Sequence, residues 1–156
     1  MNYRLYTFVA HHYLSPLQCG IQSAHVVSEL ANLHRVADEQ KRQIFELWAG
    51  LDKTIIVCGA GNHEGVVTCW ANLANLTPSF DLPFAIFNED ERSMNRMATA
   101  CGVIVPQKFW DVTFEKEENV WVHKDTYSGD EPVYHYHGQD SIEGRLIDYI
   151  KSHRLV

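Results

Sequence analysis

Four short runs of β-branched, aromatic and other apolar residues divide the first 106 residues of the chain, and their order constrains the fold more than any other feature. Each run is too short to form a stable helix alone, so each predicts a buried strand. The runs cover residues 4–10, 53–58, 83–88 and 99–105. Helical spacing or turn residues fill the intervals. This order predicts an α/β fold, in which helices cover a mixed sheet of four strands.

The intervals between the runs carry helix signals. Ser15 stands directly before Pro16, and a capping hydroxyl followed by proline predicts a helix start. Apolar residues then recur at three- and four-residue spacing down to about His34, at Ile21, Ala24, Val27, Leu30 and Ala31. Two further helices are predicted over residues 38–49 and 64–76, the second with an apolar face of Val67, Trp70, Leu73 and Ala74. The predicted architecture is a single three-layer domain.

The composition changes after Pro106. Residues 107–137 are aromatic and charged, and the segments 119–123 and 132–137 alternate around Ser128-Gly129-Asp130, as a β-hairpin would. Asp140 or Ser141 is positioned to cap a last helix over residues 142–152. The sequence therefore predicts a C-terminal extension of a hairpin and a helix, within one domain over residues 1–156.

Charge and cysteine usage limit the classes of partner. With 156 residues and a formal net charge of −7, the chain is unsuited to bulk DNA, because that affinity depends on lysine and arginine neutralising phosphates. No stretch approaches the ~18 apolar residues of a membrane span, and the start lacks a secretory pattern. The cysteines fit neither a disulfide framework nor a Cys-x-x-Cys motif. We expect free thiols and a cytoplasmic location, without a membrane partner.

Two separated motifs resemble the archaeal and eukaryotic type of peptidyl-tRNA hydrolase. The first is the run over residues 14–25, which carries a Gln-x-x-His pair at Gln22 and His25. The second is the strand 83–88, an acidic loop, and Asn95 followed by Thr99 and a strand that ends at Pro106. The resemblance covers residues 3–108 and implies a four-stranded mixed sheet and hydrolysis of a peptide ester of tRNA. The chain would be a divergent, phage-encoded member.

The chain departs from the family pattern at the residues that the resemblance links to catalysis. The loop before the first helix holds His11 and His12 but no lysine, and residues 88–93 keep an acid and an arginine but lose a glycine. A polyanionic substrate and the charge that develops during ester hydrolysis both call for fixed cations. Neutral imidazole substitutes for lysine only in part at pH 7. The departures favour binding over hydrolysis.

Ligands of open α/β sheets bind at the carboxyl ends of the strands, where three candidate segments lie. Helix N-termini and glycine turns suit phosphate, and arginines can fork onto its oxygens. The predicted ligand-binding residues are His11, His12, Ser15, Gln18 and Gln22, then Gly61 and Asn62, then Asn88, Arg92, Asn95 and Arg96. On one helical turn, Arg92 and Arg96 would share a face. The alternatives are an ordinary helix cap, a tight turn and a solvated loop.

These features predict a protein that binds a small phosphate-bearing, nucleotide-like ligand and sequesters it, as a viral anti-defence sponge would in the host cytoplasm. One alternative is a hydrolase of esters or phosphodiesters, with His25 or Asp90 as base and Thr99 or Asn95 as polar orienter. Another is a protein-binding adaptor. The alternative role of His25 is that of a core histidine. His135 and His137 could both bind a metal ion, but the sequence offers no third metal ligand, so we expect no metal. We also expect no cofactor.

Aromatic residues are frequent in residues 107–137, which we call the tail. They include Trp110, Trp121, Tyr134 and Tyr136. Such residues pack at interfaces or wall pockets more often than they lie free in water, and they could stack on a ligand base. We therefore expect a homo-oligomer, a dimer or higher, with this tail at the interface or beside the ligand.

Overall fold

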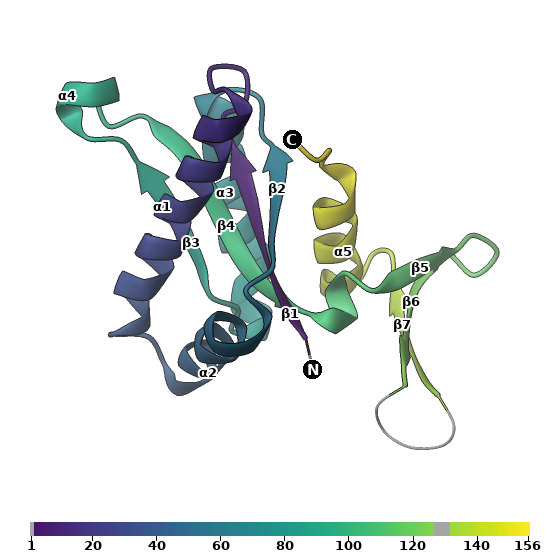
Figure 1. The fold of residues 1–156 in the computed structure, drawn as a ribbon. Helices are drawn as coiled ribbons and strands as arrows, with labels where there is room; N and C mark the ends of the chain where they lie inside the picture. The colour runs from purple at the N-terminus through teal and green to yellow at the C-terminus, as the bar shows by residue number, and fades with distance from the viewer. Residues whose placement is uncertain (1, 127–131) are drawn as a thin grey trace.

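The computed structural model describes residues 2–126 and 132–156, and a four-stranded sheet forms its centre. The strands follow the order β2-β1-β4-β3, and β4 is antiparallel to both neighbours while β1 and β2 are parallel. The strands are β1 (Tyr3–Val9), β2 (Ile55–Gly59), β3 (Phe84–Asn88) and β4 (Ala98–Pro106). The predicted mixed sheet is confirmed. The carboxyl ends of β1, β2 and β3 share one edge with the start of β4 (Figure 1).

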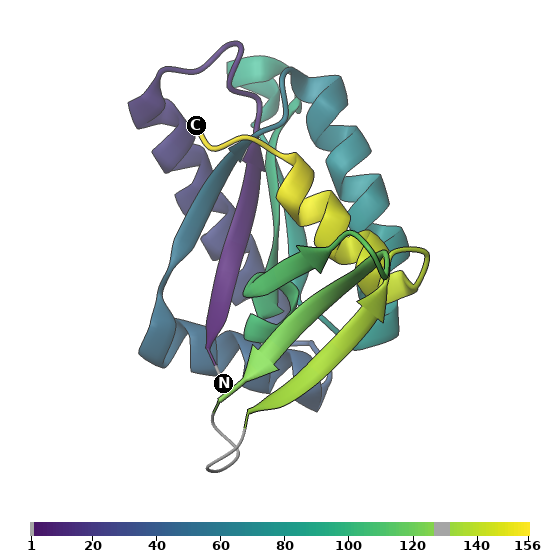
Figure 2. The same cartoon turned by 90° about the vertical axis from the view of Figure 1, so that its right-hand side faces the viewer.

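Helices cover both faces of this sheet, which gives the predicted three layers (Figures 1 and 2). The helix α1 (Pro16–His34) lies on one face, and α3 (His63–Leu76) and α5 (Ile142–Ser152) lie on the other. Adjacent residues of β1 show the division. Thr7 contacts Ser23 of α1 through their hydroxyls at 2.8 Å, whereas the ring of Phe8 packs 5.7 Å from that of Tyr149 in α5.

The helix starts follow the capping signals of the sequence. Ser15 and Gln18 form a capping box: the Ser15 hydroxyl accepts from the Gln18 amide at 3.3 Å, and the Gln18 side chain accepts from the Ser15 amide at 2.8 Å. The cap of α5 is Ser141, whose hydroxyl accepts from Gly144 at 3.0 Å. Of the two caps predicted for the last helix, the structure selects Ser141.

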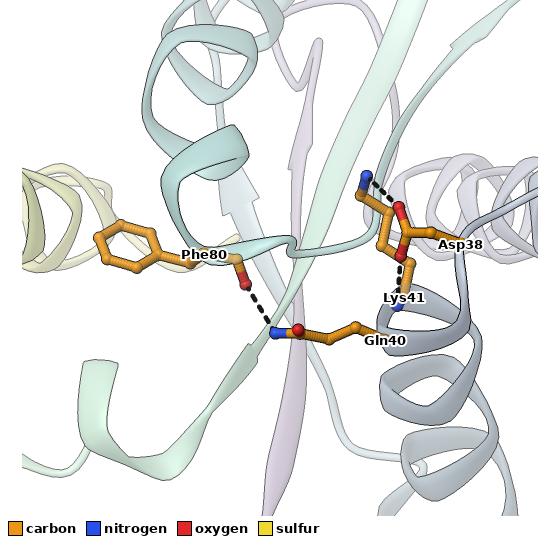
Figure 3. A network of polar contacts seen from close by, with 4 residues as sticks. All are labelled: Asp38, Gln40, Lys41 and Phe80. Carbon is orange, nitrogen blue, oxygen red and sulfur yellow. Dashed lines mark hydrogen bonds and ion pairs between the residues drawn. The ribbon is translucent and has the colours of Figure 1, made fainter.

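The short helix α2 (Glu39–Leu47) follows α1 and is fixed at its start by side chains (Figure 3). Asp38 accepts from the Lys41 amide at 3.0 Å and pairs with its ammonium at 2.8 Å. Gln40 donates to the carbonyl of Phe80 at 3.5 Å, across to the 3₁₀ turn Thr77–Phe80. A π-helical turn, Trp48–Asp52, extends the helical path beyond the predicted end.

The buried face of α1 differs from the predicted stripe. Ile21, Ala24 and Ala31 are exposed, and the buried residues are Cys19, Gln22, Ser23, Val26 and Leu30. The physical reason is that two polar side chains of the helix find partners in the sheet, so the inward face includes them. The same error affects the third helix, where Val67 and Trp70 are exposed and Val66, Cys69 and Leu73 are buried.

The tail forms a second sheet rather than a lone hairpin. Three antiparallel strands follow the order β5-β6-β7: β5 (Val112–Glu115), β6 (Val120–Asp125) and β7 (Val133–Gly138). The sequence pattern did not predict β5. The predicted turn over Ser128-Gly129-Asp130 lies outside the described residues. Within the described part of the chain, no helix is both long and apolar enough to cross a bilayer.

Two tryptophans join this tail to the rest of the chain. The guanidinium of Arg4 lies 3.5 Å from the ring centroid of Trp110, and the indole of Trp121 donates to Asp148 at 2.8 Å. Both tryptophans therefore have partners within the chain. Tyr134 and Tyr136 are exposed.

Candidate functional site

The predicted site segments meet at one edge of the central sheet. Since β1, β2 and β3 run in the same direction, the loops that follow them emerge together, and the start of α1, capped by Ser15, lies on the same side of the molecule as the end of β3, which is Asn88 (Figure 1). The amide of Ala10 donates to the carbonyl of Thr99 at 3.0 Å, which ties the end of β1 to the start of β4. We call this region the carboxyl edge.

The loop after β1 and the turn after β2 bind each other at the carboxyl edge. The amide of Gly61 donates to Nδ1 of His11 at 3.1 Å, and the amide of His12 donates to the Gly61 carbonyl at 3.0 Å. Gly61 has φ +80°, a conformation that a side chain disfavours. Because Nδ1 accepts a hydrogen bond, the neutral His11 ring carries its proton on Nε2. His11 therefore offers a fixed N–H donor.

The N-terminus of α1 offers fewer donors than the sequence suggests. The capping box uses the amide and hydroxyl of Ser15 and the backbone amide and side-chain oxygen of Gln18. Pro16 has no N–H, and the amide of Cys19 donates to the Ser15 carbonyl at 2.9 Å. The first turn thus presents one amide, that of Leu17, to a ligand.

The start of α3 lies against the turn after β2. Asn62 caps this helix, and its side-chain oxygen accepts from the amide of Gly65 at 3.0 Å. A Cβ at Gly65 would approach the carbonyl oxygen of Ala60 to 1.8 Å, so only glycine fits there. The side-chain oxygen of Asn62 thus serves the helix start, at the position predicted for ligand binding.

An irregularity in the sheet turns Thr99 towards α1. The pairing of β3 and β4 shifts between Phe87 and Asn88, so Thr99 has no partner opposite in β3. In a regular strand Thr99 would share a face with Cys101, whose thiol lies 3.6 Å from the Val66 carbonyl of α3. The bulge reverses this orientation. The Thr99 hydroxyl instead donates to the side-chain oxygen of Gln22 at 2.9 Å.

Gln22, Thr99 and Glu89 form one polar network on the α1 face. The amide nitrogen of Gln22 donates to Oε1 of Glu89 at 2.7 Å, while its oxygen accepts from Thr99. The two partners fix the amide orientation, because only its nitrogen can donate to a carboxylate. Thr99 and Gln22 are buried, and Glu89 is half-buried. The network therefore holds a carboxylate at the carboxyl edge.

The sequence pattern did not indicate Glu89 as a site residue. The residues predicted there were its neighbours, Asn88 for ligand binding and Asp90 for catalysis. The signal for Glu89 was its place directly after the third apolar run. Asn88 is exposed at the end of β3. A residue directly after β3 can turn its side chain back towards α1. The bulge in the pairing of β3 and β4 determines that Glu89 is the residue that does so.

His25 lies one turn after Gln22 on α1 and stacks on an aromatic ring of β3. Its centroid is 4.3 Å from that of Phe87, with an interplanar angle of 12°. The imidazole is half-buried. His25 therefore lies beside the polar network, with one face of its ring covered.

Asp90 caps the short helix α4 (Glu91–Met94). Its carboxylate accepts from the amides of Arg92 and Ser93, both at 2.7 Å, and from the Ser93 hydroxyl at 2.8 Å. The hydrogen bond from the Ser93 hydroxyl, followed by those from the backbone, lowers the pKa of Asp90. A general base works best with a pKa near the operating pH, so this environment points away from the base role.

The two arginines of the loop after β3 do not share a helical face, and that prediction is wrong. The helix α4 ends at Met94, and Asn95 and Arg96 have positive φ values of 50° and 59°. Arg96 pairs with Glu91 at 3.2 Å. Arg92 is exposed, and among residues 2–126 and 132–156 no carboxylate lies within ion-pair distance of it. Arg92 is therefore a cation that a ligand at the carboxyl edge could use.

The tail lies away from the carboxyl edge of its own chain, so its aromatic rings do not reach a ligand held there by the same chain. Because β4 is antiparallel to the other strands, its end at Pro106 lies at the opposite edge, and the tail begins there (Figure 1). The exposed aromatic ring near the candidate site is instead Tyr13, in the loop after β1.

A separate groove of about 590 Å³ lies between the second half of α1, Trp70 and the outer side of β3. None of the predicted site residues lines it. Within the described part of the chain, no group of three or more histidine, cysteine or acidic side chains is arranged to hold a metal ion.

No model of a known protein family matches the chain, and no curated protein matches it. The resemblance to peptidyl-tRNA hydrolases therefore stays a prediction that depends on the two motifs.

Proposed function

We propose that the protein binds a small phosphate-bearing ligand of nucleotide type at the carboxyl edge and holds it without converting it. The observation that carries this proposal is the parallel direction of β1, β2 and β3. It places the loop with His11 and His12, the Gly61 turn and the loop with Arg92 along one edge.

The donors at this edge suit an anion. The Nε2–H of His11, the amide of Leu17 and the guanidinium of Arg92 would donate to phosphate oxygens, and charged donors give the stronger bonds. Both α1 and α3 begin here, so their positive dipole ends favour negative charge. Gly61 lets a ligand approach the backbone. Tyr13 would stack on a base.

Binding without conversion follows from the chemistry of the nearby groups. Asp90 is occupied as a helix cap, and His25 stacks on Phe87. The loop with His11 and His12 lacks the lysine that the resemblance implies for a hydrolase. A protein with these groups would sequester its ligand.

The proposal is tested by identifying what the purified protein carries. Native mass spectrometry reports bound mass and subunit number together, and heat release followed by chromatography with mass detection identifies the ligand. An intact nucleotide supports sequestration. A cleaved nucleotide supports catalysis, and the absence of any ligand favours the adaptor alternative. The predicted homo-oligomer is tested in the same experiment.

Arg92→Ala measures the contribution of the unpaired guanidinium. We expect nucleotide affinity to fall about tenfold or more, because hydrogen bonds to charged groups contribute about 1.5–3 kcal/mol. Arg42→Ala is the matched control, since Arg42 is an exposed arginine on α2, far from the carboxyl edge. Isothermal titration calorimetry measures both. Equal dissociation constants for the two variants would remove Arg92 from the site.

One observation favours a second candidate, hydrolysis of an ester or phosphodiester. The network of Gln22, Thr99 and Glu89 holds a carboxylate beside His25 at the carboxyl edge. If the protein turns over its ligand, Glu89→Gln should abolish product formation while leaving ligand affinity nearly unchanged. Loss of binding together with turnover would assign Glu89 to ligand positioning instead.

A further inference from the structure

A second cluster of reactive groups lies on the opposite face of the sheet, away from the carboxyl-edge residues. Cys69 of α3 has its sulfur 3.6 Å from Nε2 of His153, which follows α5. Nδ1 of His153 lies 2.8 Å from the carbonyl of Tyr149, so it carries the proton and donates to that carbonyl. The carbonyl thus aims Nε2 at the sulfur. All four cysteines of the chain are free and buried.

Cys101 of β4 completes this cluster. Its thiol donates to the carbonyl of Val66 at 3.6 Å, one helical turn before Cys69 in α3, and it is close enough to the Cys69 sulfur to interact with it. The rings of Phe8 and Tyr149 pack against His153 at centroid distances of 4.7 and 4.8 Å. The cluster therefore joins α3, β4 and the segment after α5. A change at one sulfur alters the contacts of all three.

The surroundings of Cys69 favour its thiolate. The hydrogen bond from Cys101 and then that from His153 lower the pKa of Cys69 to about 5, against the opposing effect of burial. The same hydrogen bond with Cys69 raises the pKa of His153. Both shifts describe an ion pair of thiolate and imidazolium. The hydroxyl of Tyr149 is buried without a hydrogen-bond partner of good geometry among the described residues, and it interacts with Cys69.

We propose that Cys69 and Cys101 are a thiol pair that hydrogen peroxide oxidises to a disulfide, with Cys69 as the attacking sulfur and His153 as the proton donor to the leaving hydroxide. The Cys69 thiolate attacks one peroxide oxygen, the O–O bond breaks, and the leaving hydroxide takes the proton of the His153 imidazolium. Cys69 is then a sulfenic acid. The Cys101 sulfur attacks it, the S–O bond breaks, and the thiol proton leaves with hydroxide as water. Two thiols and one peroxide give one disulfide and two waters.

Cys58 supplies an internal control. It is as deeply buried as Cys69 and lies in β2, but burial and then the charge of Cys69 raise its pKa to about 11. At pH 7 the thiolate fraction of Cys69 would exceed that of Cys58 by about 10⁴. The lower intrinsic nucleophilicity of a thiolate with a lower pKa offsets about 10³ of this. We expect Cys69 to react about tenfold faster than Cys58.

The consequence of oxidation reaches the carboxyl edge. The residues after His153 pair with β2: the amide of Gly59 donates to the Arg154 carbonyl at 2.9 Å, and Leu155 forms a bridge with Cys58. Gly59 begins the turn that contains Gly61. Oxidation of Cys69 removes the thiolate that holds His153 and so loosens the segment that lines the outer side of this turn.

The test treats the full chain with a small excess of hydrogen peroxide at pH 7, traps free thiols with iodoacetamide, and quantifies each cysteine by peptide mass spectrometry. The expected result is a cross-linked pair of peptides containing Cys69 and Cys101, formed about tenfold faster than any oxidation of Cys58. Oxidation of Cys58 at the same rate as Cys69, or loss of free Cys69 without the cross-linked pair, would overturn the proposal.

The pH dependence of the alkylation rate distinguishes a Cys69 thiolate paired with His153 from a Cys69 thiol that is only more accessible to the reagent. In the wild type, alkylation of Cys69 by iodoacetamide should stay nearly constant from pH 8 down to about pH 6, while alkylation of Cys58 falls about tenfold per pH unit. His153→Gln should slow Cys69 and make its rate fall with pH, and it should leave Cys58 unchanged. A Cys69 rate that follows Cys58 at every pH in the wild type would contradict the assignment without any variant.

Discussion

The two faces of the central sheet stabilise buried polar groups in different ways. On the α1 face, Thr7 and Ser23 share a hydrogen bond, and Gln22 joins Thr99 to Glu89. On the opposite face, the buried heteroatoms are mainly sulfurs. They are Cys58, Cys69 and Cys101, with His153 as the ionisable partner. The first face relies on hydrogen bonds of fixed direction, and the second on a contact between the Cys69 sulfur and the His153 imidazole within a shell of aromatic rings.

This difference separates two kinds of chemistry in one small protein. The network on the α1 face ends in the half-buried Glu89 at the carboxyl edge, where a ligand can reach it. The sulfur cluster is enclosed by Phe8, Tyr149 and the end of α5. The two proposals therefore place ligand binding beside the first face and redox chemistry on the second. Three stability measurements sharpen or break this contrast.

The largest effect is expected from Phe8→Ala. Phe8 is fully buried and packs on Tyr149 and His153, so the substitution should reduce the free energy of unfolding by about 3–5 kcal/mol. Ile21→Ala is the control on the α1 side, where Ile21 is 47% exposed, and it should change stability by about 0.5 kcal/mol or less. Urea denaturation measures both. A large loss for Ile21→Ala would restore the apolar stripe predicted from sequence.

The same contrast explains which parts of the fold could be predicted. The strands of the central sheet were found because each is a compact apolar run, and all their bounds agree to within two residues. The inward face of α1 was not found, because Gln22 and Ser23 are buried by hydrogen bonds to partners far away in the chain. The spacing of apolar residues carries no information about such distant hydrogen-bond partners.

The candidate site was predictable in location but not in detail. The rule that ligands meet strand ends brought His11, Gly61 and Arg92 to one edge. The bulge at Thr99 could not be predicted, because it depends on the pairing of two strands and not on either one alone. The bulge selects Thr99 to meet Gln22, and Glu89 joins it. The left-handed residues Asn95 and Arg96 likewise ended α4 before the expected arginine pair could form.

A smaller effect is expected on the α1 face from Thr99→Val. The substitution keeps the shape of the side chain but leaves the buried oxygen of Gln22 without its donor, so stability should fall by about 1–3 kcal/mol. Adding Gln22→Leu removes the unsatisfied oxygen, and the double variant should recover part of the loss. A double-mutant cycle in urea measures the coupling. Strictly additive losses would mean that this network does not act as a unit.

The smallest effect, and the most specific to the sulfur cluster, is a dependence of stability on pH. In the folded protein the pKa of Cys69 is lowered to about 5 and that of His153 is raised, while ordinary values are 9.0 and 6.5. From pH 6.5 up to the raised pKa of His153, the folded ion pair and the unfolded thiol with neutral imidazole hold equal numbers of protons, so the Cys69–His153 pair does not make stability depend on pH over that range. Below pH 6.5 the unfolded chain takes up a further proton, which the folded pair accepts only near pH 5.

The stabilisation from the ion pair should therefore fall as the pH drops from 6.5 towards 5, and the difference in unfolding free energy between wild type and Cys69→Ala should shrink over that interval. Taking the difference cancels His137, whose pKa burial lowers from its ordinary value of 6.5. Asp38 and Asp90, with lowered pKa values, act below their ordinary value of 3.8. Ser23→Ala on the α1 face removes no titrating group, so its curve should run parallel to the wild type. A constant difference for Cys69→Ala between pH 7.5 and 5 would show that Cys69 is a neutral thiol, and the contrast between the two faces would reduce to one of packing.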